Sequence, residues 1–271
     1  SEVVSEIREY PRLTTTVANA YIQPLLSSYL ERLGAELEDL GYSCVLLTML
    51  SAGGMASVSA ASAFPVRLLE SGPAAGAVLA ERLSTVTAQH DLLVFDMGGT
   101  TAKASLVLGG RVQRTGQFEV GRVHRFKAGS GIPIKTPVLD LLEIGAGGGS
   151  IARADRLGLL AVGPESAGAS PGPACYGLGG AEPTVTDADL LLGYLDPDYF
   201  LGGRMRLDVE AARAALARLG SRFGMDALEA AWFVHSAVDD NMAGAARVHL
   251  TERGIDPSRL ALLALGGAAP V

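Results

Sequence analysis

Apolar side chains recur at helical spacing in several parts of the chain. They predict a long helix over residues 14–40, with threonines before it and a glycine after it. A second helix is expected to begin at Ser71, a plausible N-cap. Toward the end of the sequence the same spacing predicts helices over residues 207–220, with Asp208 as the candidate N-cap, and over residues 225–252.

Short apolar runs between these helices predict strands. Residues 43–50 and 258–265 have the composition of buried strands, and residues 64–70 form a further candidate extended segment. A hydrophobic run ends at Asp96, and Gly109–Gly110 separates two strand-like runs in the manner of a β-hairpin. Strands and hairpins that alternate with long helices indicate an α/β domain with a mixed sheet.

The composition is that of a folded protein and argues against several classes of partner. The 271 residues are 48% hydrophobic, which is enough for a large core. A formal charge of -7, without a run of Lys and Arg, disfavours nucleic acid or an anionic membrane as the main partner. The sequence shows neither a bilayer-spanning apolar segment nor a signal-peptide pattern, which predicts a cytoplasmic location. Because it begins with Ser1 and stops just after a glycine pair, we expect it to be a piece of a longer protein.

The segment FDMGGTTAK follows a predicted strand and offers groups that suit a phosphate. Its glycines permit positive φ and remove side chains, so backbone N–H groups can converge on an anion. Asp96 could hold Mg²⁺ through water or orient an attacking nucleophile. Strand-like residues follow the glycines, so this is not a Walker A loop, and a plain two-glycine turn is the alternative. The candidate cofactor-binding residues of this segment are Gly98, Gly99, Thr100, Thr101 and Lys103.

A second glycine-rich string, EIGAGGGSIA, covers residues 143–152. It could bring backbone amides close to a phosphate, or let two domains pack closely. A flexible loop is the alternative, but Ile144 and Ile151 flank the string and suggest that both of its sides are anchored. The candidate cofactor-binding residues here are Gly147, Gly148, Gly149 and Ser150.

The string PTVTDADLLLG offers two aspartates for chemistry. Asp187 or Asp189 could bind a metal ion or act in acid/base chemistry; alternatively, Thr186 or Asp187 caps the helix that follows. Upstream, Cys175 is a candidate nucleophile, although a buried small thiol is the more usual finding.

Together these strings resemble the hydantoinase A/5-oxoprolinase family, which also includes acetone carboxylase subunits. The matching strings, in family order over nearly the whole chain, are REYPRLTTTVANAYIQPLLSSYL, ESGPAAGAVLA, DMGGTTAKASLV, IGAGGGSIA, VGPESAGASPGPACYGLGGAEPTVTDADLLLG and LGGAAP. The resemblance implies the α/β fold of the actin, sugar-kinase and heat-shock-chaperone ATPases, in which two ribonuclease-H-like halves enclose ATP. DMGGTT would then be the second phosphate hairpin, and Gly266 with Gly267 would lie near the adenosine.

The same resemblance implies how this chain relates to a complete enzyme. The first phosphate hairpin of the family lies in an N-terminal domain, and no second DxGGT string precedes Asp96. Residues 1–70 are therefore expected to continue from a missing N-terminal domain, and residues 71–271 to form a ribonuclease-H-like hydantoinase A domain. The fragment alone is expected to be inactive.

By resemblance, the complete enzyme is an ATP-dependent hydrolase that opens a cyclic amide such as a hydantoin, N-methylhydantoin or 5-oxoproline. Catalytic roles fall on Asp96 and Asp187, and Mg²⁺ or Mn²⁺ ligation on Asp96 and Asp140. The alternatives are a subunit of an ATP-dependent ketone carboxylase and a nucleotide-binding module without activity. A second hydantoinase-type subunit is an expected partner, and a homo-oligomer is conceivable.

Two departures from the family pattern affect these assignments. The chain has SAGG over residues 51–54 where members often have SNGG, and Asp140–Glu143 where many have an Asp-Ile-His-Thr-like string. The second departure removes a histidine that would be a metal or substrate ligand. Asp140 is accordingly either a remaining ligand or a strand-end cap.

Overall fold

The computed structural model describes residues 2–123 and 129–269, which form two compact units. Unit 1 comprises Ser1–Leu92 with Ser105–Asp140, and unit 2 comprises Leu93–Ala104 with Leu141–Val271. The boundaries of these units differ from those of the predicted segments 1–70 and 71–271. The predicted segments describe the organisation of a longer protein, and they stay a prediction.

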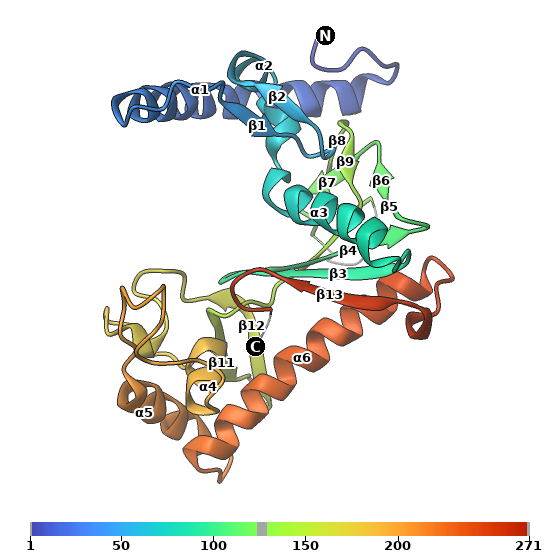
Figure 1. Ribbon diagram of the computed structural model, residues 1–271. Helices are drawn as coiled ribbons and strands as arrows, with labels where there is room; N and C mark the ends of the chain where they lie inside the picture. Colours follow the sequence, from blue (N-terminus) through green and yellow to red (C-terminus); the bar gives the residue numbers. More distant parts are fainter. Residues whose placement is uncertain (1, 124–128, 270–271) are drawn as a thin grey trace. The chain divides into compact units, whose positions relative to one another are not determined.

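The helices are distributed over both units (Figure 1). The α-helices are α1 Glu9–Asp39, α2 Val58–Ala63, α3 Ser71–Thr87, α4 Val185–Leu191, α5 Val209–Gly220 and α6 Ala227–Thr251. The short 3-10 helices are η1 Pro65–Leu68, η2 Ala174–Tyr176 and η3 Pro257–Arg259. In the described residues, no helix combines the length and the apolar character that crossing a membrane requires.

The strands are mostly short. Their bounds are β1 Leu47–Met49, β2 Met55–Ser57, β3 Leu92–Met97, β4 Ala102–Leu108, β5 Arg111–Val112, β6 Arg114–Thr115, β7 Phe118–Val120, β8 Ile132–Ile134, β9 Val138–Leu139, β10 Leu141–Ile144, β11 Ser150–Ala154, β12 Leu160–Ser166 and β13 Ala261–Leu265. The main sheet has the order β10-β4-β3-β13, with β5 paired to β4. The pairs β1-β2, β6-β9, β7-β8 and β11-β12 form separate two-stranded sheets.

In unit 1, α1 is held mainly through polar side chains. Thr15 and Asn19 are buried, although a helix usually buries apolar residues. The Thr15 hydroxyl accepts a hydrogen bond from the Lys135 amide at 2.8 Å. The Asn19 side chain donates to the Ala63 carbonyl at 3.1 Å and accepts from the Val66 amide at 3.2 Å. These bonds satisfy backbone groups at the end of α2, in η1 and just after β8.

The apolar face used to predict α1 is largely exposed in the described residues. The helix itself is confirmed and passes through Pro24. Val17 is 58% exposed, Tyr21 86% and Leu25 76%. Helical spacing therefore located the helix correctly without identifying which of its faces is buried in unit 1.

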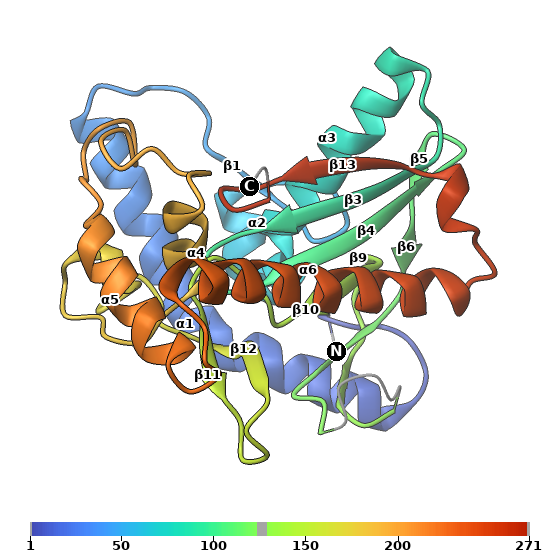
Figure 2. The same cartoon turned by 90° about the horizontal axis from the view of Figure 1, so that it is seen from below.

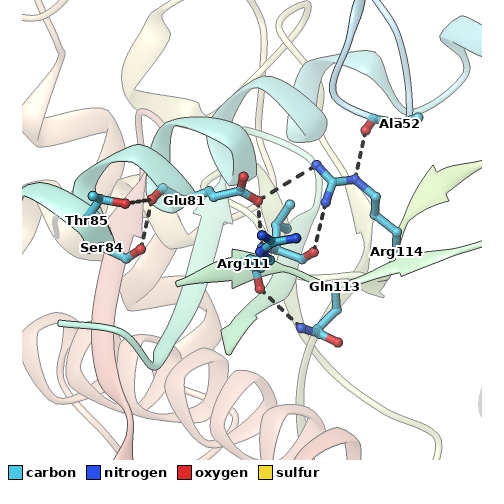
Figure 3. A network of polar contacts seen from close by, with 8 residues as sticks. Ala52, Glu81, Ser84, Thr85, Arg111, Gln113 and Arg114 are labelled. Carbon is cyan, nitrogen blue, oxygen red and sulfur yellow. Dashed lines mark hydrogen bonds and ion pairs between the residues drawn. The ribbon is translucent and has the colours of Figure 1, made fainter. Parts of the chain in front are cut away.

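The SAGG loop of unit 1 is held by a polar network around Glu81 of α3 (Figure 3). The Glu81 carboxylate accepts from the Val112 amide at 2.8 Å and lies 3.8 Å from the Arg114 guanidinium. Arg114 in turn donates to the carbonyls of Ala52 and Val112, both at 3.3 Å. Gly53 has φ +89°, and a Cβ there would lie 2.6 Å from a side chain of α3. The loop thus has one tightly determined conformation.

In unit 2, α4, α5 and α6 pack together beside the sheet, and α6 runs along the sheet (Figure 2). Capping residues explain where the longer helices begin. Asp208 accepts from the Ala211 amide at 2.9 Å, which confirms the predicted N-cap of α5. Asp226 caps α6 and forms a capping box with Glu229. The core beneath these helices is built from small and branched apolar residues of the sheet and helices.

Several predicted elements are wrong in extent or kind. The run 43–50 contains only the short, partly exposed β1, and 64–70 contains the 3-10 helix η1 in place of an extended segment. Pro65 is in the first turn of η1, where its missing N–H costs no hydrogen bond. Strand β13 is half-exposed rather than buried, because it is the edge of the sheet. Ser71 is the first residue of α3, after Glu70 as N-cap.

The predicted hairpin at Gly109–Gly110 is confirmed in its turn. Both glycines have positive φ, 57° and 74°, as a two-residue hairpin turn with the twist of its strands requires. Beyond the turn, the predicted second strand breaks into β5, β6 and β7, which pair with three different strands.

Candidate functional site

The turn between β3 and β4 is the centre of the candidate site. The Gly98 amide donates to the Thr101 carbonyl at 3.1 Å, which closes the turn. Gly99 and Thr100 are exposed at its tip. No described residue accepts a hydrogen bond from their two amides. These amides, with the threonine hydroxyls, are the donors that an incoming anion would meet.

Asp96 lies at the end of β3, directly before this turn. A Cβ placed on Gly266 would be 2.7 Å from the Asp96 carboxylate oxygen and 2.4 Å from the Met97 carbonyl oxygen. Gly266 has φ +91°, so both the space and the backbone conformation require glycine. Among the described residues, none donates to the Asp96 carboxylate. A carboxylate without a donor from the protein suits a hydrated cation.

The predicted glycine pair also contacts the turn through its backbone. The Ala268 amide donates to the Met97 carbonyl at 3.0 Å. Gly266 and Gly267 thus lie beside Asp96, within unit 2. Contact of this pair with an adenosine stays a prediction.

The second glycine string packs directly on the turn. The Gly148 amide donates to the Gly98 carbonyl at 3.1 Å, and the Gly149 amide donates to the Gly99 carbonyl at 2.6 Å. A Cβ on Gly147 would lie 2.7 Å from the Thr100 carbonyl carbon. The string thus packs closely on a turn of its own unit, and the two predicted uses, binding a phosphate and close packing of two domains, both stay predictions.

The amides of this string are already used inside the protein. Besides the two bonds to the turn, the Gly147 amide donates to the Ser150 hydroxyl at 2.9 Å, and the Ser150 amide donates to the Gly147 carbonyl at 2.9 Å. In this arrangement two of the amides support the turn, the other two close the string on itself, and none of the four is directed at an anion. Direct cofactor contact by residues 147–150 stays a prediction that requires these bonds to open.

Helix α4 holds the glycine string from its other side. The amide and the hydroxyl of Thr186 both donate to the Gly148 carbonyl, at 2.7 and 2.8 Å. The N-cap of α4 is Thr184, which shares a capping box with Asp187, so neither predicted cap was at the N-cap itself. α4 therefore anchors the string by its first turn.

Asp187 is fully buried and surrounded by donors. Its carboxylate accepts from the amides of Cys175, Ala174 and Thr184, at 2.8, 3.2 and 2.9 Å, and from the Thr184 hydroxyl at 2.9 Å. These bonds tie η2 to α4. Asp187 takes part in the capping box of α4 as its third helical residue, but the N-cap is Thr184 and neither of the predicted residues. A catalytic role for Asp187 stays a prediction.

Asp189 of α4 forms a charged cluster with His235 and Asp239 of α6, which the sequence did not reveal. His235 Nδ1 lies 2.9 Å from Asp189 Oδ1, and His235 Nε2 lies 3.5 Å from Asp239 Oδ2. Burial raises the pKa of Asp189 to about 6, although the hydrogen bond and charge of His235 oppose the increase. Burial also raises the pKa of Asp239. Asp189 and His235 are far apart in sequence, so no local pattern could have paired them.

The three residues of this cluster are part of the lining of a cavity of about 410 Å³ between α6 and the sheet. The remainder of the lining is mainly apolar, with Phe95, Met97 and Met242 among the larger side chains. Arg247 adds a further charged group. The cavity is therefore a mainly apolar space with a few charged groups in its lining, and the strand that carries Asp96 forms part of its wall.

The remaining predicted site residues are Lys103 and Asp140, and Cys175 was a further candidate. Lys103 lies on β4, two residues beyond the turn, and is partly buried. Asp140 lies in unit 1 and Asp96 in unit 2, so their pairing as metal ligands stays a prediction. Within residues 2–123 and 129–269, no group of three or more His, Cys, Asp or Glu could hold a metal ion. Cys175 is a buried free thiol whose pKa is raised by burial and by Asp187, as the non-catalytic interpretation predicts.

Residues 12–271 match the model of the hydantoinase/oxoprolinase family. The chain belongs to this family. It is 41% identical to the uncharacterized protein MJ0964 of Methanocaldococcus jannaschii, over all of this chain and 40% of that protein. It is 39% identical to the alpha subunit of caprolactamase from Pseudomonas jessenii, over 99% of this chain and 37% of that subunit. The chain thus spans about two fifths of the length of these hydantoinase/oxoprolinase relatives.

A solved structure of acetone carboxylase without nucleotide superposes on 98% of this hydantoinase/oxoprolinase chain. The TM-score is 0.86 at 25% sequence identity, and the match covers 36% of the acetone carboxylase chain. The predicted family and the predicted α/β fold class are therefore both confirmed. The turn after β3, the glycine string and the glycine pair lie within the matched part of the family model.

Proposed function

We propose that this chain is the part of an ATP-dependent cyclic amidohydrolase that holds the nucleotide phosphates. The observation that carries the proposal is the turn at Gly99 and Thr100, whose amides have no acceptor in the described residues, beside the partnerless carboxylate of Asp96. Family membership supports ATP as the ligand, because relatives include an enzyme whose solved structure is titled ATP-dependent caprolactamase. The substrate classes proposed are a hydantoin, N-methylhydantoin, 5-oxoproline or a related lactam.

The residues of the turn fit a phosphate group. Two N–H groups and two hydroxyls at one exposed tip can satisfy several phosphate oxygens. Asp96 would hold Mg²⁺ or Mn²⁺ through water, since a hard cation prefers oxygen ligands and keeps several waters. ATP, when bound, supplies a phosphoryl group that can activate the amide oxygen of the substrate. The glycine string and Gly266 keep the turn in place because larger residues would displace it.

Phosphate release by the full-length protein tests the proposal. We expect release in the presence of ATP and Mg²⁺ to increase with hydantoin, N-methylhydantoin, 5-oxoproline or caprolactam. Asp96→Asn is expected to abolish that increase, whereas Asp198→Asn, at an exposed ion pair with Arg206, leaves it unchanged. A protein whose phosphate release responds to no cyclic amide would refute the hydrolase assignment.

The structural likeness to acetone carboxylase favours one alternative, a subunit of an ATP-dependent ketone carboxylase. ATP turnover that requires both bicarbonate and a ketone would select it over the hydrolase. A third possibility, a nucleotide-binding module without activity, would bind ATP and Mg²⁺ but release no phosphate with either substrate class.

A second subunit is also proposed as a partner, because the caprolactamase relative is named as an alpha subunit. Co-purification of the full-length protein with the product of a neighbouring gene, followed by comparison of phosphate release with and without it, tests that requirement.

A further inference from the structure

Helix α4 contacts the glycine string, which packs on the proposed phosphate-binding turn, and it also contacts His235 of α6. At its first turn, Thr186 donates twice to the Gly148 carbonyl, at 2.7 and 2.8 Å. Three residues later, Asp189 is hydrogen-bonded to His235 of α6 at 2.9 Å. Residues three apart lie on neighbouring positions of a helix surface, so one short element carries both contacts.

The connection is stiff because α4 is almost completely enclosed. Thr186, Asp187 and Asp189 are no more than 8% exposed. Between the two outer contacts, Asp187 accepts hydrogen bonds from η2 and from Thr184. A seven-residue helix held in this way shifts as a unit, and a displacement at Asp189 therefore reaches Thr186.

The orientation of His235 is also determined on several sides. Its two ring nitrogens face Asp189 and Asp239, at 2.9 and 3.5 Å. The rings of Tyr194 and Trp232 lie 5.1 and 6.0 Å from the imidazole. The side chain is 12% exposed, and that of Asp189 is 6% exposed. The pair is consequently a fixed contact between α4 and α6, unlike a surface ion pair.

We propose that Asp189 and His235 are a positioning pair for the phosphate turn. The pair keeps α4 where Thr186 can hold Gly148, and the amides of Gly148 and Gly149 then support the turn at Gly98 and Gly99. In the described part of the chain no hydrogen bond or ion pair joins Asp189 to the turn residues 98–101, so the proposed action runs through Thr186 and Asp189 is a positioning residue, not a catalytic one. The part of this inference that concerns nucleotide affinity rests on the proposed function.

Hydrogen exchange in the full-length protein tests the structural part without any ligand. In Asp189→Ala, exchange of the amides of Gly148, Gly149 and Thr186 is expected to accelerate by about tenfold, the factor for losing one hydrogen bond to a charged group. Asp189→Asn keeps an acceptor for His235 and is expected to exchange like the wild type. The matched control is Glu210→Gln, at an exposed ion pair of α5, which should also be unchanged. Unaltered exchange in a folded Asp189→Ala protein would overturn the proposal.

ATP affinity tests the functional part in the same proteins. Asp189→Ala and His235→Ala are expected to raise the ATP dissociation constant about tenfold, and Asp189→Asn to restore it. Thr186→Val removes one hydrogen bond to Gly148. The double variant Thr186→Val/Asp189→Ala should raise the ATP dissociation constant no more than the stronger of the two single variants, because both substitutions act on the same contact. Additive effects would contradict action through Thr186. A wild-type protein that binds no ATP would refute the proposed function, while the exchange result would still decide the positioning role.

Discussion

Gly147 offers a direct test of the packing between the glycine string and the turn that joins β3 to β4. Replacing it with alanine would place a Cβ 2.7 Å from the Thr100 carbonyl carbon and 2.8 Å from the Gly98 carbonyl oxygen. These are backbone atoms, so no flexible side chain can move aside. Gly147 does not have a positive φ, and the expected penalty is therefore steric. The string must withdraw from the turn for the alanine to fit.

The size of the effect follows from what the withdrawal breaks. Overpacking of a tight site costs about 1–3 kcal/mol. Each of the bonds from Gly148 and Gly149 to the turn adds about 0.5–1.5 kcal/mol if it is lost. We therefore expect Gly147→Ala to lower the free energy of unfolding by about 2–6 kcal/mol.

Gly99→Ala is the matched control for this measurement. It lies in the same turn, also lacks a positive φ, and a Cβ there meets nothing within 4 Å. Its free energy of unfolding is expected to change by less than about 0.5 kcal/mol. Urea denaturation of the wild type and the two variants, followed by fluorescence, measures the difference. Equal stability of the two variants would refute the steric argument.

Three further predictions concern the site and its surroundings. Asp96→Asn is expected to abolish ATP turnover with little change in stability, because no described residue pairs with the carboxylate; unchanged phosphate release would remove Asp96 from the site. Burial raises the pKa of Asp189 from 3.8 to about 6, so the folded protein binds the carboxyl proton more tightly than the unfolded chain does. The protonated carboxyl therefore adds to the free energy of unfolding at low pH, and this contribution is lost as the pH rises through 6. A pKa difference of about two corresponds to about 3 kcal/mol, so the Asp189→Asn variant, which keeps His235 and Asp239, should be more stable than the wild type at pH 8. Urea titrations at several pH values should show that the variant lacks this pH dependence. Asp226→Ala removes the bonds to the Leu228 and Glu229 amides, at 2.8 and 2.9 Å, and is expected to cost about 1 kcal/mol by thermal denaturation; no loss would exclude a stabilising cap.

Local features of this protein could be predicted from the sequence. The turn after Asp96, the hairpin turn at Gly109–Gly110 and the N-cap Asp208 each depend on residues within a few positions of one another. Backbone preferences of glycine and capping by aspartate act over that range, so the chemistry is present in the string itself. The family resemblance rested on the same local strings, and it is confirmed.

Other features were decided only when distant segments met. The amides of Gly148 and Gly149 looked available for a phosphate, but the carbonyls of Gly98 and Gly99, far earlier in the chain, accept their hydrogen bonds. Helical spacing could not show that α1 would leave Val17 exposed in unit 1, because spacing does not name the surface that a face meets. The pairing of Asp189 with His235 joins residues 46 positions apart. Burial and long-range hydrogen bonding are properties of the assembled structure, and they determine which of the candidate groups are left free to bind a ligand.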